Sequence, residues 1–315
     1  MPIALIVIMI TLATGSGVTL AAEQSLPGEV LYPVKVAVNE KLQAAVALST
    51  EAKARVQTKL ASRRLDEAEK LAANTKLHTE ARLQVQNNFE KHADRVQAHI
   101  EDLETRGKIS AAAEVSSNLE GSLKAHENIL SKLAEKNNKE IPALLLQVKT
   151  DREKATSARL HFEEELRKKD EAAEQPEKNG AEIRAQMQAE VKAAAEGRLN
   201  AATNKIAEAK AFFEKQKADL SAEAVLKAEA QIKAAEQTLA AGQATLEAQA
   251  YAEAFALFSQ THRQAQEAKL IMQANKELKI ESSTQIEAQV ETENKIELEN
   301  KVTPKKARPK IEILY

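Results

Sequence analysis

Three histidines have a spacing that could bring a metal ion between neighbouring helices. His92 and His99 are seven residues apart, and His126 follows in a later helical stretch. Two helical turns separate the first pair by about 10 Å, whereas zinc holds its ligand nitrogens at about 2 Å. One ion therefore cannot bind both, although His92 or His99 could meet His126 across two helices. The interpretation that we favour is that all three are packed or half-exposed imidazoles, with no metal site.

Carboxylates and motifs give no sign of catalysis. The consecutive Glu163, Glu164 and Glu165 are typical of a solvated helix face, because a catalytic carboxylate needs a dry, shaped pocket to raise its pKa. The sequence has no Cys, phosphate loop, dinucleotide fingerprint, HExxH motif or nucleophile elbow. We therefore predict that the protein is not an enzyme and has no cofactor.

The composition predicts that helices carry these side chains. Aromatic residues make up 3% of the chain, with no Trp, 8 Gly and 7 Pro, and Ala, Glu, Lys, Gln and Leu dominate its middle. This profile is typical of long helices packed side by side. The 45 basic and 47 acidic side chains are interspersed and give a net charge of −2, so nothing attracts nucleic acid in general. The predicted fold class is all-α, without a nucleic-acid partner.

Residues 1–22 are an apolar leader. No charged side chain lies between Pro2 and Ala22, and the most apolar run covers residues 3–13. The length approaches the roughly 20 residues that cross a bilayer, whereas the small and polar second half is typical of a signal peptide. A buried core helix is less favoured, because a soluble helix normally has a polar face. Cleavage and membrane anchoring both remain open, and both predict an extracytoplasmic protein.

A motif with two prolines follows the leader. The stretch LPGEVLYPVK occupies residues 26–35. We expect a turn at Pro27 and Gly28, extended backbone at Leu31 and Tyr32, and a helix from Pro33 onward. The leucines and the tyrosine of this motif should pack beneath the first helices as a plug.

This motif, with the stretch ASRRLDEAEKLA at residues 61–72, resembles an uncharacterised extracytoplasmic bacterial domain family. Its signature is LPG-x-x-LYPVK directly after a membrane segment. The residues that match the signature are Leu26, Pro27, Gly28, Leu31, Tyr32, Pro33, Val34 and Lys35. The resemblance covers residues 23 to about 170. It implies a helical domain of unknown function outside the membrane, in which the motif is structural.

Some members of this family are parts of proteins that resemble anti-sigma factors. Those proteins carry a cytoplasmic domain ahead of the membrane segment, and here nothing precedes that segment. We therefore expect no sigma-factor-binding domain, and the anti-sigma role is not carried over to this chain.

Apolar periodicity predicts the helices of the first unit. Apolar residues recur at three- and four-residue steps in residues 77–103, 112–133 and 142–166. Ser49 should cap an earlier helix, Ser110 the second of these stretches, and Pro142 should open the third. Because short connections favour antiparallel neighbours, we predict a domain of about four or five helices over residues 23–169.

The rest of the chain is predicted to form a linker, a second bundle and a tail. The polar residues 170–182 include a proline and a glycine and should form a linker. Long apolar stripes over residues 183–276, partly at heptad spacing, predict an elongated, coiled-coil-like bundle of three antiparallel helices. Residues 277–315, acidic and then basic, should be a disordered tail. Whether the two helical units touch stays open.

These features predict a non-enzymatic structural or interaction protein of the bacterial cell envelope. Its amphipathic helix faces would bind a protein partner or a second copy, and its leader would contact the membrane. The alternative is an extracytoplasmic sensor, or a ligand- or metal-binding module, related to the outer domains of anti-sigma-like regulators. A ligand-dependent melting shift would favour the alternative, and concentration-dependent association the first hypothesis. Lengthwise helix packing leads us to expect no cavity.

Overall fold

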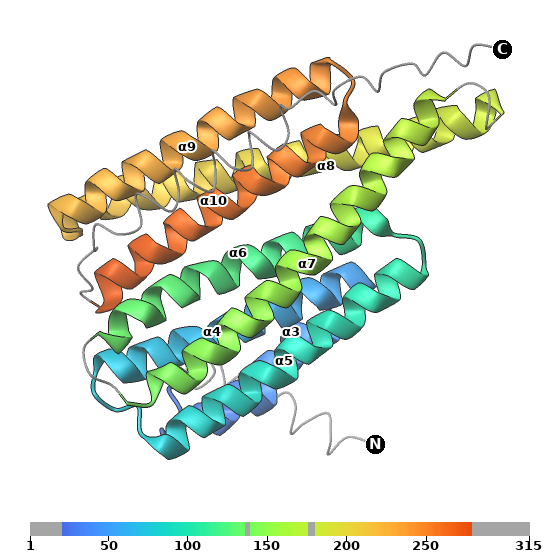
Figure 1. The fold of residues 1–315 in the computed structure, drawn as a ribbon. Coiled ribbons are helices and arrows are strands. Elements are labelled where there is room, and N and C mark those ends of the chain that lie inside the picture. Colours follow the sequence, from blue (N-terminus) through green and yellow to red (C-terminus); the bar gives the residue numbers. More distant parts are fainter. Residues whose placement is uncertain (1–20, 136–138, 176–179, 279–315) are drawn as a thin grey trace, which may run out of the picture. The chain divides into compact units, whose positions relative to one another are not determined.

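The fold is all-α, as the composition predicts. The computed structural model describes residues 21–135, 139–175 and 180–278, and these residues contain no strand. The elements are α2 (Tyr32–Val34), the π-helical η1 (Lys35–Asn39), α3 (Glu40–Ala45), α4 (Thr50–Ala73), α5 (Thr79–Thr105), α6 (Ile109–Ala134), α7 (Ile141–Glu174), α8 (Ala181–Gln216), the 3₁₀ turn η2 (Lys217–Asp219), α9 (Ala222–Glu247) and α10 (Tyr251–Leu278) (Figure 1).

Both ends of the chain lie mostly outside this description. Of the predicted leader only Ala21 and Ala22 are described, and of the predicted tail only residues 277 and 278. Among the helices that are described, none combines the length and the apolar character that crossing a bilayer would require.

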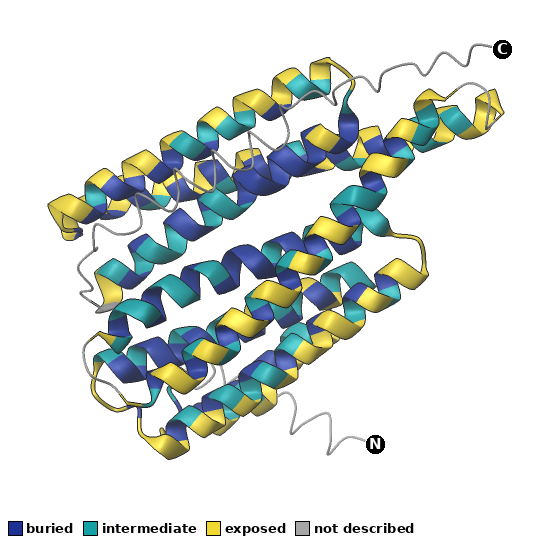
Figure 2. Cartoon of the chain, viewed as in Figure 1, coloured by how far each residue is buried: buried dark blue, intermediate teal, exposed yellow. Residues whose placement is uncertain are grey.

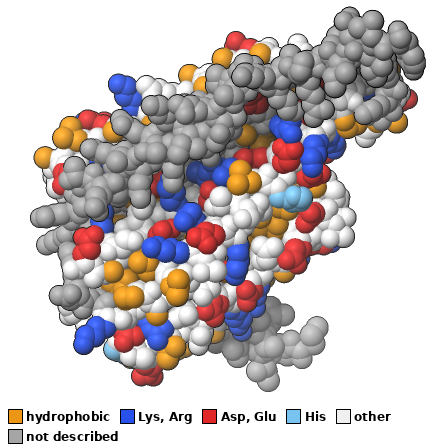
Figure 3. Space-filling view, in the orientation of Figure 1, with side chains coloured by type: hydrophobic (Ala, Val, Ile, Leu, Met, Phe, Trp, Pro, Cys, Tyr) orange, Lys and Arg blue, Asp and Glu red, His pale blue; other side chains and the backbone are white. Residues whose placement is uncertain are grey.

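Helix α6 is the centre of the packing. It packs against α4, α5, α7 and α10, and Figure 2 shows buried residues along most of its length. Its predicted stripe from Ala112 to Leu133 is buried, as is the stripe of α5 from Leu77 to Leu103. The outer faces of α5 and α7 are largely exposed (Figure 2). Figure 3 shows acidic and basic side chains interspersed over the face in view, as expected for solvated helices.

The two predicted helical units share one core. Helices α8, α9 and α10 pack together, and α10 also packs against α6 and α7. A single cluster of buried apolar side chains includes Phe89 and Leu123 from the first half and Val191 and Phe258 from the second. The described residues accordingly form one compact unit.

Helix α7 extends into the predicted linker. It continues to Glu174 instead of ending near residue 166, and α8 begins at Ala181. The reason is a tertiary contact: the carboxylate of Asp170 accepts a hydrogen bond of 2.8 Å from the backbone nitrogen of Ala252, in the first turn of α10. A polar residue that favours a linker in sequence is therefore used here to join two helices.

The helix starts predicted at Ser49 and at Pro142 are confirmed. Ser49 caps α4, since its Oγ accepts from the backbone nitrogen of Ala52 at 3.1 Å, and Pro142 lies in the first turn of α7. The predicted cap at Ser110 is wrong, because α6 begins at Ile109 without a side-chain cap. Gly107 has φ +69°, and the tight turn that it makes after α5 lets α6 begin before Ser110.

The chain turns within the motif as predicted, but the helix that follows begins earlier than predicted. Gly28 has φ +92°, which confirms the turn. The predicted extended backbone is wrong: Leu31 has φ −91° and ψ −4°, and Tyr32 is the first residue of α2. The backbone nitrogen of Tyr32 donates to the carbonyl oxygen of Glu29 at 3.1 Å, and the Tyr32 side chain is 3% exposed. Burial of the ring and this turn outweigh the usual preference of a residue before proline.

Candidate functional site

The motif residues Tyr32 and Lys35 form a buried polar network with α4. The Nζ of Lys35 lies 2.6 Å from an oxygen of Glu67, and the Tyr32 hydroxyl donates to the other oxygen at 3.0 Å. Arg64 donates to the Tyr32 hydroxyl at 2.6 Å and forms ion pairs with Glu40 and Glu67. We call Tyr32, Lys35, Glu40, Arg64 and Glu67 the motif network. It joins the two stretches on which the family resemblance depends.

The motif network is closed and balanced in charge. Burial and the neighbouring Glu67 raise the pKa of the Tyr32 hydroxyl. Burial also raises the pKa of Glu67, although Arg64 and Lys35 oppose that shift. Two cations thus face two carboxylates. Of the other motif residues, Pro27 is buried, Leu26, Leu31 and Val34 are half-buried, and Gly28 and Pro33 are exposed. This arrangement attaches the N-terminal segment to α4.

The pairing of His126 with His92 or His99, which the sequence analysis did not favour, is not what the structure shows, because His126 contacts Ser62 and Glu69. His92 on α5 has its Nδ1 2.8 Å from the side-chain oxygen of Gln57, and His99 is half-buried. In the described part of the chain, the side chains of metal-ligand type that gather around His126 are Asp66 and Glu69. The face of α6 that carries His126 therefore packs against α4. The neighbours that α4 places beside His126 are carboxylates, not imidazoles.

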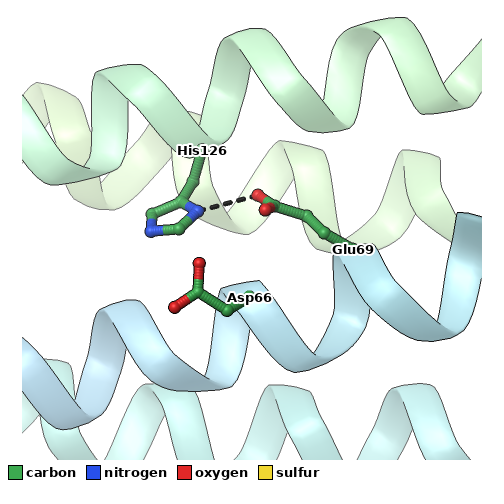
Figure 4. Close-up of side chains that lie close together, drawn as sticks. All are labelled: Asp66, Glu69 and His126. Carbon is green, nitrogen blue, oxygen red and sulfur yellow. Dashed lines mark hydrogen bonds and ion pairs between the residues drawn. The ribbon is translucent and has the colours of Figure 1, made fainter. Parts of the chain in front are cut away.

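Asp66, Glu69 and His126 form a compact cluster between α4 and α6 (Figure 4). Asp66 and Glu69 are three residues apart, so they share one face of α4. The Nδ1 of His126 donates to Glu69 at 2.7 Å, and its Nε2 lies 2.7 Å from the Oγ of Ser62. One potential ligand atom from each of the three residues lies within 4.8 Å of the others. We call this set the carboxylate–histidine cluster.

The electrostatics of the cluster favour a cation. Burial raises the pKa of Glu69 to about 7, although His126 opposes the shift, and burial also raises the pKa of Asp66. Burial would lower the pKa of His126, but the adjoining Glu69 carboxylate outweighs it and the pKa is raised. Among the described residues, the Asp66 carboxylate has neither a hydrogen-bond nor an ion-pair partner. Two carboxylates therefore share one imidazole, and Lys70 and Arg63 are further cations that act on Asp66.

The sequence analysis singled out His126 but missed its partners. Asp66 and Glu69 lie within residues 61–72, where a spacing of three residues places them on one helix face. That signal is weak on its own, because many acidic pairs with this spacing are solvated in helices of this composition. Only the position of α6 against α4 distinguishes this pair from the others.

A hollow lies beside the cluster, and the expectation of no cavity is wrong. It has a volume of about 490 Å³, Ser62 and Asp66 line it, and α4, α6, α8 and α10 all contribute to its wall. Several of the lining side chains are Arg and Lys, including Arg63 and Lys269. Long cationic side chains repel one another and do not interdigitate as apolar ones do, so the helix seams stay open here.

The described residues thus offer two polar features: the carboxylate–histidine cluster, which can bind a cation, and the adjoining hollow, whose charged lining residues are mostly basic. Ser62, His126 and Glu69 also follow one another in hydrogen-bond contact, as a nucleophile, a base and its orienting carboxylate would. These contacts do not identify a particular reaction. Comparison of the chain with protein-family models, with curated proteins and with solved structures finds no match, so the functional proposal depends on the geometry of these features.

Proposed function

We propose that the protein is a non-enzymatic, extracytoplasmic ligand-binding module that binds a divalent cation at Asp66, Glu69 and His126. The observation that supports this function is the approach of three potential ligand atoms to within 4.8 Å, from two different helices. One imidazole and two carboxylates suit zinc and other divalent first-row transition ions. A site with three protein ligands leaves a fourth position for water.

Side-chain shifts would bring the cluster to coordination distance. In a tetrahedral site two ligand atoms at about 2.1 Å from the ion lie about 3.4 Å apart, so atoms that are now up to 4.8 Å apart must close by up to about 1.4 Å. The ion would replace the hydrogen bond from the His126 Nδ1 to Glu69. The Nε2 of His126, 2.7 Å from Ser62, would then donate to that hydroxyl and hold the ring in place.

The apolar leader and the family resemblance support placement outside the bacterial cytoplasmic membrane. A cation held by α4 and α6 would stabilise the contact between them, because both helices supply ligands. Since α6 also packs against α7 and α10, the cation would act on the centre of the fold. This central position favours the hypothesis of a ligand-binding module over the hypothesis of a structural protein that acts only through its outer helix faces.

Zinc is expected to raise the melting temperature of the full-length protein after treatment with EDTA. At 100 times the Kd the stabilisation is about 2.7 kcal/mol. Asp66→Asn should weaken zinc binding about tenfold or more, because it removes a charged ligand. The apo protein should melt almost as the wild type does, because the carboxylate has no partner to lose. Isothermal titration and differential scanning calorimetry measure both effects.

The control is Asp94→Asn, which changes an exposed aspartate of α5 and should bind zinc as the wild type does. Zinc binding should also weaken from pH 8 to pH 6, because protons compete for Glu69, with its pKa of about 7, and for His126. The proposal would be wrong if zinc, manganese and cobalt all left the melting temperature unchanged, or if Asp66→Asn bound zinc as tightly as Asp94→Asn.

A second candidate function is docking on a lipid surface through α3 and its flanks. Val38, Leu42 and Val46 follow one another at four-residue steps and are 43%, 60% and 77% exposed. Val30 and Leu48, at the two ends of this segment, are 92% and 89% exposed. The face comes directly after the apolar leader, and we propose that it lies in the headgroup region of the membrane that the leader enters.

Single tryptophans can test this docking, because the chain has no Trp of its own. In full-length protein reconstituted into phospholipid vesicles, Leu42→Trp should show blue-shifted emission that brominated lipids quench. Leu160→Trp is the control, since Leu160 is 53% exposed on α7. Equal emission and equal quenching of the two variants would exclude the lipid surface as the partner of this face.

A further inference from the structure

Two hollows adjoin in the wall between α4, α6, α8 and α10. Their volumes are about 490 and 500 Å³, which is within the range of small-molecule sites. Arg55, Asn118 and His262 line both, so the two hollows are neighbours. We call the two together the cationic hollow.

The charged side chains that line the cationic hollow are mostly basic. Its charged lining residues are the cations Arg55, Lys59, Arg63, Arg198, Lys205 and Lys269 and the acids Asp66 and Glu114. Glu114 pairs with Arg55 at 2.7 Å, and Lys205 and Lys269 share one carboxylate, that of Glu208. In the part of the chain that is described, Lys59 has no ion-pair partner. Positive charge therefore exceeds negative charge around the space.

His262 lines this space and has a polar group without a partner. The residue is 8% exposed, and its Nδ1 is fully buried without a hydrogen-bond partner among the described residues. Burial lowers its pKa well below the usual 6.5, and the nearby Arg198, Lys205, Arg263 and Arg55 lower it further. The ring is therefore neutral and retains one N–H donor. A buried polar nitrogen without a partner is costly and calls for an explanation.

Arg198 offers a second unused donor beside it. Its side chain is 1% exposed, and its Nε and Nη2 donate to Ser259, Ser117 and Asn118 at 3.0, 3.3 and 3.0 Å. Its Nη1 makes no hydrogen bond in the described structure, and the nearest carboxylate oxygen, from Glu114, is 3.9 Å away. The guanidinium is thus held by three contacts, and one buried N–H pair of this lining residue makes no hydrogen bond.

We propose that the cationic hollow binds a small molecule with an oxyanion group, a phosphate or a carboxylate, whose oxygens accept hydrogen bonds from Arg198 and His262. Charge-assisted bonds of this kind are the strong ones, and a rigid guanidinium loses little entropy when it makes them. The surrounding lysines would attract the anion and close over it. This site is distinct from the cation site, although Asp66 lies at the boundary of both.

The test uses the full-length protein after treatment with EDTA and removal of the chelator by gel filtration, so that neither a bound cation nor the chelator's own carboxylates affect the result. Inorganic phosphate, pyrophosphate and citrate are titrated against it by calorimetry, with sodium chloride at matched ionic strength as the reference. His262→Leu should weaken binding of the best probe about tenfold, as expected when one donor to a charged group is lost. Lys59→Gln, which changes an exposed side chain and should fold normally, should weaken it about threefold.

Lys215→Gln is the matched control, because Lys215 is an exposed lysine of α8 that does not line the hollow. It should bind as the wild type does. Asp66→Asn should bind the anion at least as well, so failure of the cation site and failure of this site can be told apart. Binding of citrate alone, or of the phosphates alone, identifies the oxyanion. The proposal is overturned if no probe exceeds matched sodium chloride, or if Lys59→Gln and Lys215→Gln bind alike.

Discussion

Arg64→Met is expected to lower the free energy of unfolding by about 3–5 kcal/mol, because it removes one partner from a buried ion-pair network. The Arg64 side chain is 0% exposed, and it contacts Glu40, Glu67 and the Tyr32 hydroxyl. After the substitution, Lys35 and the more distant Arg63 are the cations left for two buried carboxylates. Urea denaturation of the full-length protein, followed by its helical circular dichroism, measures the loss.

Arg55→Met is the matched control for this prediction. It makes the same change on the same helix, but Arg55 is 60% exposed and pairs with Glu114 at the surface, so the cost should be at most about 1 kcal/mol. The double variant Arg64→Met with Glu40→Gln should recover part of the loss, since it also removes an unpaired charge. An equal loss in Arg64→Met and Arg55→Met would show that the motif network does not hold the N-terminal segment.

Phe258→Ala should cost about 3–5 kcal/mol, through lost burial and the cavity left behind. Phe258 is 0% exposed and lies in the core that the two halves of the described chain share. Its packing is tight, since a Cβ placed on Gly242 of α9 would lie 2.6 Å from the ring. Because the core is shared, the loss should be felt in α4 and α5 as well as in α8, α9 and α10.

Amide hydrogen exchange with peptide resolution separates these outcomes. Amides of α5 that exchange only through global unfolding should exchange faster in Phe258→Ala than in the wild type. Leu226→Ala is the control, because Leu226 on α9 is 68% exposed and should change exchange little. If Phe258→Ala accelerated exchange only in α8, α9 and α10, the two halves would unfold independently and the shared core would contribute little to their cooperation.

Local signals in the sequence were sufficient for much of the helical structure. The stripe from Leu77 to Leu103 is buried as predicted, since a period of three to four residues places those side chains on one face of a helix. Ser49 caps α4 because its hydroxyl is within reach of a backbone nitrogen three residues on. Such features depend only on neighbouring residues, and they can therefore be deduced without knowledge of the rest of the chain.

The errors concern residues whose partners lie far along the chain. Asp170 appeared to belong to a linker, and a hydrogen bond to Ala252 places it on α7 instead. The acidic partners of His126 were not foreseen, and it meets Glu69 on α4 instead of remaining a simple packed imidazole. In both cases several partners of suitable chemistry were available in the sequence. The order in which the helices pack selects one of them.

The amino-acid sequence alone determined that the described chain is all-helical, where most of its helices lie and which stripes they bury, because helix formation and amphipathic character are read over a few turns. Tertiary structure alone decided that both halves share a core, that the motif reaches Arg64 and Glu67, and that Asp66, Glu69 and His126 meet beside a hollow lined by cations. The physical reason is that amphipathic stripes of similar composition can pack in many pairings, and only the complete set of contacts distinguishes among them.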